Sequence, residues 1–363
     1  MAKERIWGDI LSSFEDYKTK YHRLNNKRMV FAALFFILAF VSIFVTLGFG
    51  VYKISVIDAI GAFFNHITDN IVSRKDDLYV WDIRLPSAIG GAVIGAGLAL
   101  GGVVMQNLMH NPLAEPYTMG VSSGAFFGAV LFMICGISIV PFLEGEAATI
   151  ANAFLCSLIP IGIFVLVSRF KKMSPTAMIL IGIAMMYVFS SITQYYMVTS
   201  PAEDMAGAYH WRVGSLSRIG WEELPIIVTI VGVTSALLIT MYRKLDVMYS
   251  GDNCAHTLGV NTSGLRITCM ALVSLMTAGI VCFTGTIGFI GLVGPHIARA
   301  FVGSKNKILI PGSMAFGAAF LVIADMIAKV SGINGLPVGV ISSMVGGPLF
   351  LYVLIKQRKK VWN

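Results

Sequence analysis

The sequence predicts an all-α protein that crosses a membrane about ten times and keeps both termini in the cytoplasm. Only 13% of the residues are charged, and the mean hydropathy is +0.78. Soluble domains usually carry about 25% charged residues. Long apolar runs recur along the chain, and 363 residues leave room for roughly ten spans of about 20 residues each. Lys and Arg are also unevenly distributed among the loops that join these runs.

Ten apolar runs are the expected spans. The first follows a charged tail and lacks a small-residue cleavage site, so we expect a span rather than a secretory signal. The chain thus divides into a tail at 1–28, a membrane domain at 29–355 and a basic cytoplasmic tail at 356–363. The runs lie at 29–50, 85–108, 117–142, 147–168, 176–198, 224–242, 265–284, 285–301, 309–330 and 337–355.

The tail at 1–28 has apolar residues at helical spacing among its charges. Trp7, Leu11 and Phe14 belong to this pattern, which favours an amphipathic helix on the cytoplasmic leaflet. A frayed tail is the alternative, and the sequence supports both equally.

Positive charges orient the spans. With the N-terminus inside, 20 of the 27 Lys and Arg residues fall in cytoplasmic segments. This distribution obeys the positive-inside rule, which the reverse orientation violates. Membrane topology therefore accounts for the net charge of +8, and no nucleic-acid partner is expected. The seven outside are Lys53, Arg74, Lys75, Arg84, Arg212, Arg218 and Lys329.

Glycine is dense in the segment 84–124. A glycine costs a soluble helix about 1 kcal/mol relative to alanine, whereas in a membrane it lets helices approach closely. A polar corner at 111–116 separates two glycine-stepped helices in this segment. We therefore expect tightly packed membrane helices here. The candidate packing residues are Gly91, Gly95, Gly97, Gly101, Asn111, Pro112, Gly120 and Gly124.

The longest cytoplasmic connection between spans, at 243–264, contains a second candidate site. Asp252 is suited to cap a short helix that ends at Gly259. This helix is expected to present Ala255, His256, Leu258 and Val260 to the cytoplasm. It is either a surface helix packed on its own membrane domain or a docking element for a cytoplasmic partner.

Catalytic signatures are missing from the sequence. There is no G-x-x-x-x-G-K-[ST] phosphate-binding loop, so the chain is not expected to hydrolyse ATP. The five cysteines form neither a CxxC pair nor a Cys/His cluster, so no metal site is expected. No nucleophile with a matching base is apparent either, and we expect no enzyme activity and no cofactor bound by this chain.

Two further groups of residues are candidates for function. Asp325 and Lys329 have the i,i+4 spacing of an ion pair near the outer end of a span. They form a structural pair, or Lys329 receives a soluble partner. The run 176–198 is rich in Met and Tyr, which are typical of packing but also suit a path for a bulky ligand. The candidate path residues are Met185, Met186, Tyr187 and Gln194.

Several motifs together resemble the FecCD family, the membrane permeases of type II ABC importers for iron-siderophores, haem and cobalamin. The resemblance covers about residues 80–355, with the motifs in the family's order. The motifs are Arg84-Leu-Pro, Gly101-Gly-Val-Val-Met-Gln106, Asn111-Pro-Leu-Ala-Glu-Pro116, Gly120-Val-Ser-Ser-Gly124, Gly251-Asp252, Leu258-Gly-Val260, Gly288-Phe-Ile-Gly-Leu-Val-Gly-Pro-His-Ile-Ala-Arg299, Ala324-Asp325, Leu336-Pro-Val-Gly339 and Gly347-Pro348.

This resemblance implies a homodimer in the cell membrane with the translocation path at the dimer axis. It implies two cytoplasmic ATPase subunits, which hold the ATP and Mg²⁺ and dock on Gly251, Asp252, Ala255, Leu258, Gly259 and Val260. It also implies an extracytoplasmic binding protein that delivers a metal chelate and meets Arg84 and Lys329. The glycine-stepped helices become part of a moving gate. The chain departs from the family at Ser87 and Gly335, where arginine and glutamate are usual, so the docking ion pairs are expected to differ.

An ion-coupled secondary transporter is the alternative from another class. It predicts carboxylates at the membrane centre and uptake without ATP. The sequence offers few such carboxylates.

Overall fold

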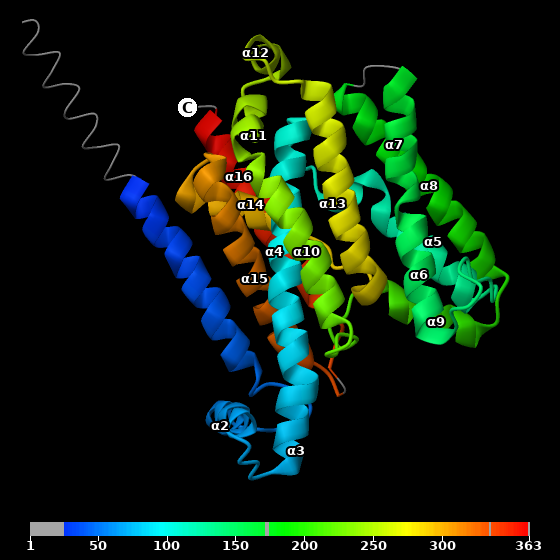
Figure 1. Ribbon diagram of the computed structural model, residues 1–363, viewed down its shortest axis with the longest axis vertical. Helices are drawn as coiled ribbons and strands as arrows, with labels where there is room; N and C mark the ends of the chain where they lie inside the picture. The colour runs from blue at the N-terminus through cyan, green and yellow to red at the C-terminus, as the bar shows by residue number, and fades with distance from the viewer. Residues whose placement is uncertain (1–24, 171–173, 334, 362–363) are drawn as a thin grey trace, which may run out of the picture.

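The computed structural model describes residues 25–170, 174–333 and 335–361, and residues 1–24 of the expected amphipathic tail at 1–28 lie outside them. The described chain is a bundle of helices whose long members run roughly along one axis (Figure 1). Within those ranges, its only β pairing is an isolated bridge between Val213 and Thr286. The loop helix α12 (Asp252–Thr257) lies at one end of the bundle, and α2 (Val56–Ile67) lies at the other.

Six helices in the described part are long and apolar enough to cross a membrane. The helix pair α10 (Leu224–Thr240) and α11 (Tyr242–Tyr249), with a bend of 59° between them, is long and apolar enough only when taken as one unit, which gives up to seven spans in the described part. Four of the six are single helices: Asn25–Thr46, α8 (Pro175–Val198), α13 (Thr262–Thr284) and α15 (Asn306–Val330). The stretch Arg74–Met109 is built from α3 (Arg74–Asp77), η1 (Leu78–Arg84) and α4 (Leu85–Met109). The stretch Gly145–Phe170 is built from α6 (Gly145–Ser157) and α7 (Ile159–Phe170).

Shorter apolar helices account for the other expected runs. These are α5 (Val121–Met133), α14 (Ile290–Val302) and α16 (Val338–Val361). Each of the ten apolar runs of the sequence therefore corresponds to one helix or one bent helix pair. Two more short elements, η2 (Pro116–Met119) and α9 (Ala202–Arg212), connect them.

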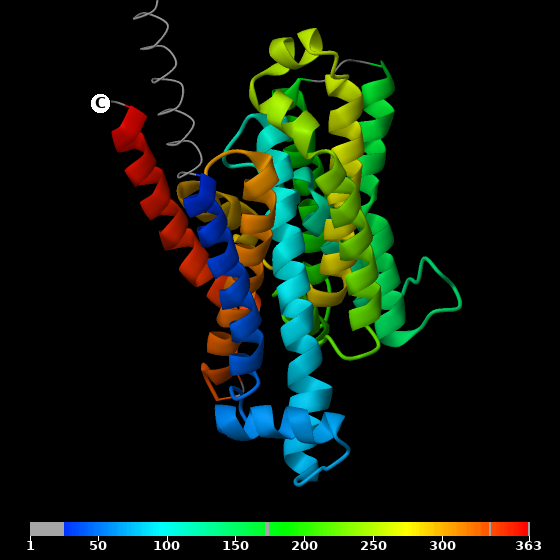
Figure 2. The ribbon, with the colours of Figure 1, turned by 60° about the vertical axis from the view of Figure 1, so that its left-hand side comes forward.

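Helix α4 is the centre of the bundle, and α10, α13, α14 and α15 surround it (Figures 1 and 2). Nearly every residue of α4 is buried, so it has no polar face. Glycine makes this packing possible. A Cβ added to Gly95 would lie 2.3 Å from the carbonyl oxygen of Gly317 on α15. A Cβ on Gly102 would lie 1.8 Å from the carbonyl oxygen of Gly291 on α14.

The other candidate glycines also lie at close contacts. A Cβ on Gly124 would approach Cys156 O of α6 to 2.7 Å, and one on Gly101 would approach the Pro116 ring to 2.8 Å. Gly120 has a φ of +82° and precedes α5, a conformation that side chains rarely adopt. A Cβ on Gly91 would lie 2.8 Å from the Leu216 side chain, and one on Gly97 would lie 2.9 Å from the Val231 side chain.

Non-helical backbone lies at the end of α13, where it is paired with other backbone. Gly214 N donates to Thr286 O at 3.1 Å, Ser215 N donates to Thr284 O at 2.9 Å, and Gly339 N donates to Gly214 O at 2.8 Å. Irregular backbone is tolerated at membrane depth only when its polar groups are satisfied in this way. This junction joins α9, α13 and the start of α16.

Candidate functional site

The loop at 243–264, which the sequence predicts to be cytoplasmic, forms a helical hairpin at one end of the bundle. Its second helix, α12, begins after Gly251, whose φ of +102° permits the sharp entry, and Gly259 with a φ of +79° follows its end. Asn261 then caps α13 through Gly264 N at 3.0 Å. Leu258 is 65% exposed at the tip of the loop. The hairpin therefore presents an apolar side chain on a short helix with fixed ends.

Asp252 links this loop helix to the transmembrane core. Its Oδ1 forms an ion pair with Arg266 of α13 and lies 3.2 Å from Nε2 of His110. The guanidinium of Arg266 is buried, and its Nε donates to Leu108 O at 3.0 Å, near the end of α4. Side-chain contacts therefore join α12 to both α4 and α13.

The electrostatics favour the ionised carboxylate. The hydrogen bond from Arg266 lowers the pKa of Asp252 below its usual value of 3.8, with a smaller contribution in the same direction from His110. The carboxylate of Asp252 is therefore charged at neutral pH and continues to accept both contacts.

A second link joins α11 to the same end of the bundle. Asp246 Oδ1 accepts from Asn306 N at 2.9 Å, which satisfies a free N–H at the start of α15. The Asn306 side chain in turn accepts from Asn107 Nδ2 of α4 at 2.9 Å, and both asparagines are buried. Both loop helices are therefore tied to α4.

The structure corrects two details of the sequence interpretation. Asp252 is not the cap of α12, because its carboxylate turns to Arg266 and the N-cap position is Gly251, which has no side chain. Ala255 does not face the cytoplasm but is fully buried beneath the helix. His256 and Leu258 are exposed, as expected, and Val260 is half-buried.

A cavity of about 780 Å³ opens between α5, α8, α9 and the start of α16. Hydroxyl and amide groups line it together with Met and Val side chains, and among the described residues that line it Arg212 alone is charged. Its polar lining includes Ser122, Ser123, Ser190, Thr193, Gln194, Tyr209 and Ser343. Such a lining suits a bulky polar ligand that is neutral or anionic.

The predicted path residues divide between two faces of α8. Gln194 lines the cavity, and Tyr187 lies two turns away on the same helix face and is 66% exposed. Met185 lies on the opposite face, where its Cβ is 3.4 Å from the position of a Cβ on Gly120. Met186 is partly exposed between the two faces. Of the four, only Gln194 contacts the cavity directly.

The outer corner places Arg84 in the interior. Its side chain is 3% exposed, and its two terminal nitrogens donate to Leu47 O at 2.6 Å and to Tyr52 O. The guanidinium thus holds the turn after the first span against η1. Its geometry gives no support to the predicted contact between Arg84 and a soluble partner, because both terminal nitrogens are used inside the chain.

Lys329 forms the predicted pair with Asp325, at 2.6 Å, and also donates to Ser87 Oγ at 2.7 Å. Asp325 is 4% exposed. Ser87 therefore binds the lysine of α15 from α4. Both Arg84 and Lys329 line an outer pocket of about 460 Å³, together with Arg218 and Tyr52.

Sequence reasoning missed most of this polar network. No spacing in the sequence connects His110 or Arg266 with Asp252. The sequence also did not indicate the part-buried contact of Arg299 with Gln106 Oε1 at 3.1 Å or the buried contact of His296 with Leu292 O at 2.8 Å. Within the described residues, no group of three His, Cys, Asp or Glu side chains forms a metal site.

Comparisons with known proteins give one consistent result. The sequence profile of the FecCD transport family matches residues 37–356. An ABC transporter permease protein of Methanocaldococcus jannaschii is 35% identical, over 95% of this chain and 100% of its own length. A cobalamin import system permease of Halobacterium salinarum is 35% identical over 78% of this chain and 75% of its own, and a hemin transport system permease of Yersinia pestis is 32% identical over 78% and 85%.

A solved structure agrees with these relatives. A structure described as an inward-facing conformation of a metal-chelate type ABC transporter superposes with a TM-score of 0.79. It is 26% identical in sequence, and the match covers 90% of this chain and 98% of the other.

Proposed function

The chain belongs to the FecCD transport family, whose members are membrane permeases of ABC transporters, and we propose that it moves a metal chelate into the cytoplasm by alternating access. Two copies form the path, a pair of cytoplasmic ATPases drives it, and an extracytoplasmic binding protein supplies the ligand. The chelate is of the cobalamin, haem or iron-siderophore class, because relatives with these substrates match most of the chain.

The contact of Asp252 with Arg266 and His110 is the observation that carries this proposal. A loop helix that served only as a surface feature would not need a charged link to two spans. Here the link reaches Leu108 O at the end of the central helix α4. A force applied to the exposed Leu258 by an ATPase therefore reaches the helix that packs against α10, α13, α14 and α15.

The cavity supports the class of substrate. Hydroxyl and amide groups beside Met and Val side chains suit a large ligand with both polar and apolar parts. None of the described residues that line the cavity carries a carboxylate. An ion-coupled secondary transporter would need such a group to hold and release its cation, so the ATP-driven reading is favoured.

Several apolar side chains of α8 and α16 are exposed, including Leu180, Tyr187, Met344 and Leu351. We assign part of this surface, next to the cavity, to contact with the second copy. This assignment places the cavity beside the dimer axis.

Transport measurements test the proposal. The permease, an ATPase that co-purifies with it and its binding protein are placed in lipid vesicles, and uptake of radiolabelled cyanocobalamin, hemin and a ferric siderophore is measured. We expect ATP-dependent uptake of one of them. Uptake driven by an ion gradient without ATP would contradict the proposal.

Two variants separate the parts of the mechanism. Leu258→Glu places a charge at the exposed loop tip and is expected to abolish ATPase binding. Gln194→Trp narrows the cavity with a bulky apolar side chain and is expected to reduce uptake while ATPase binding persists. Val233→Trp is the matched control, because Val233 is 56% exposed on α10 and does not line the cavity.

A further inference from the structure

Helix α2 at the outer end of the bundle lies across the direction of the spans (Figure 2). Its buried side packs Ala59 and Phe63 against a small core formed with Leu47, Val80 and Leu85. A second side is polar and includes Asp58 and Asn65. Between them runs a third strip, formed by Ile57, Ile60, Phe64 and Ile67 at helical spacing. Ile57 is 83% exposed, Phe64 56% and Ile67 58%.

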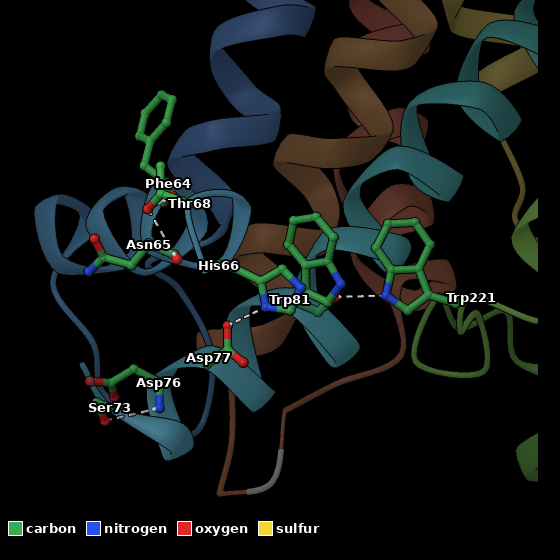
Figure 3. A network of polar contacts seen from close by, with 9 residues as sticks. All are labelled: Phe64, Asn65, His66, Thr68, Ser73, Asp76, Asp77, Trp81 and Trp221. Carbon is green, nitrogen blue, oxygen red and sulfur yellow. Dashed lines mark hydrogen bonds and ion pairs between the residues drawn. The ribbon is translucent and has the colours of Figure 1, made fainter. Parts of the chain in front are cut away.

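The position of α2 is fixed rather than loose. His66 on its buried side contacts Asp77 Oδ1 through Nδ1 at 2.7 Å, and its ring stacks on Trp81 with centroids 3.8 Å apart. Trp221 donates from Nε1 to Trp81 O at 3.0 Å, which joins this corner to the start of α10 (Figure 3). The direction of the exposed strip is thus set by the spans themselves.

The exposed strip turns toward the spans. Figure 3 shows the Phe64 ring pointing up beside the first span, whereas Asn65 points sideways and Asp76 lies below the helix. A chain of neighbouring rings leads from Phe64 to the first span. The ring centroids are 5.3 Å apart between Phe64 and Phe63, 5.6 Å between Phe63 and Phe44, and 5.1 Å between Phe44 and Phe40. Phe40 is 64% exposed on the span Asn25–Thr46. The strip therefore continues the lipid-facing surface of this span.

From this continuity we propose that the strip formed by Ile57, Ile60, Phe64 and Ile67 lies in the outer leaflet of the membrane and anchors the outer corner in lipid. A transverse amphipathic helix with its apolar side toward the acyl chains and its polar side toward water is the geometry of an interfacial helix. The small core around Leu47 then couples this anchor to η1 and α4. The bilayer is the occupant of the strip, in preference to a binding protein or a second copy.

Spin labelling of the full-length chain in lipid vesicles tests this location. Cys135 and Cys254 are first replaced by serine, because a spin label could react with these two accessible thiols. The other three cysteines are buried and are kept. Single labels are then placed by Phe64→Cys, Ile57→Cys and Asn65→Cys, with Phe40→Cys as the reference for a lipid-exposed site. Collisions with oxygen, which concentrates in the bilayer, are compared with collisions with a water-soluble nickel chelate.

We expect the ratio of oxygen to nickel collisions at positions 64 and 57 to approach that at 40 and to exceed that at 65 several-fold. Equal ratios at 64 and 65 would place the strip in water and overturn the proposal. Protection of position 64 from both reagents would also overturn it, because it would show that protein covers the strip. The experiment needs neither ATPase nor substrate, so its outcome is independent of the proposed transport function.

Discussion

Asp252 in the cytoplasmic loop and Arg266 in α13 form an ion pair whose guanidinium is buried and whose carboxylate is 40% exposed. The arginine thus belongs to the interior of the bundle, whereas the aspartate lies at its surface. Because Arg266 also donates to Leu108 O, the pair connects the loop helix to α4 with one side chain between them.

Asp252→Asn is therefore expected to separate transport from ATP hydrolysis. The neutral amide removes the charge of the pair, and we expect uptake to fall strongly while the ATPase still binds through Leu258. The exposure of the carboxylate limits the cost in the free energy of unfolding to about 1 kcal/mol. Asn253→Ala, on the same helix, is the control and should leave uptake unchanged. Normal uptake in Asp252→Asn would refute a coupling role for this pair.

The same pair predicts a pH dependence of stability. The pKa of Asp252 is lower in the folded chain than its usual 3.8, so the pair stabilises the fold fully above that pH. The stabilisation is lost as the pH falls through the lower, folded-state pKa. Thermal unfolding of the wild type and Asp252→Asn should therefore differ by a constant amount between pH 7 and about pH 4. The difference should vanish at lower pH, and a difference that disappears already at pH 6 would contradict this assignment.

Gly95→Ala tests the contact between α4 and α15. The new Cβ would lie 2.3 Å from Gly317 O, so the helices must separate, and overpacking of this kind costs about 1–3 kcal/mol. Gly232→Ala is the matched control, because no atom lies within 4 Å of its added Cβ. We expect a lower unfolding midpoint for the first variant in detergent and no decrease for the second. Equal unfolding midpoints for the two variants would mean that α4 and α15 can accommodate the added methyl group without separating.

Arg84→Met distinguishes a structural role from a docking role. Removal of the guanidinium leaves Leu47 O and Tyr52 O without their donor, and an unsatisfied buried group costs about 1–3 kcal/mol. The isolated permease, with no binding protein present, should therefore unfold at a lower temperature. If its stability is unchanged and only the affinity for a binding protein falls, the docking role implied by the family resemblance is correct after all.

The spans were predictable because the bilayer requires apolar side chains along each span and favours Lys and Arg in the cytoplasmic loops. Both preferences can be read from the residue types alone. The i,i+4 pair of Asp325 and Lys329 was predictable for a similar reason, since its geometry is local to one helix. The density of glycine indicated close packing, but it did not indicate which helix each glycine meets. The approach of Gly95 to Gly317 joins positions more than 200 residues apart.

The contacts that carry the candidate site are of this second kind. His110, Asp252 and Arg266 come from three elements, and only the folded chain brings them together. Arg84 is a similar case. The family resemblance implies that it meets a binding protein, which stays a prediction. The sequence did not indicate that its guanidinium donates to Leu47 O and Tyr52 O in the turn after the first span.

Lys329→Met is expected to destabilise the permease by about 3–5 kcal/mol, because it leaves the buried carboxylate of Asp325 unpaired. The double variant Lys329→Met with Asp325→Leu removes both charges and should recover most of this loss, as buried pairs often do when apolar residues of similar size replace them. Unfolding midpoints of the two variants and the wild type give the comparison. The double variant also tests whether Lys329 contacts a binding protein, since we expect it to keep the fold while lacking the Lys329 ammonium group. A binding protein that still binds it with full affinity would show that Lys329 serves α15 and α4 alone.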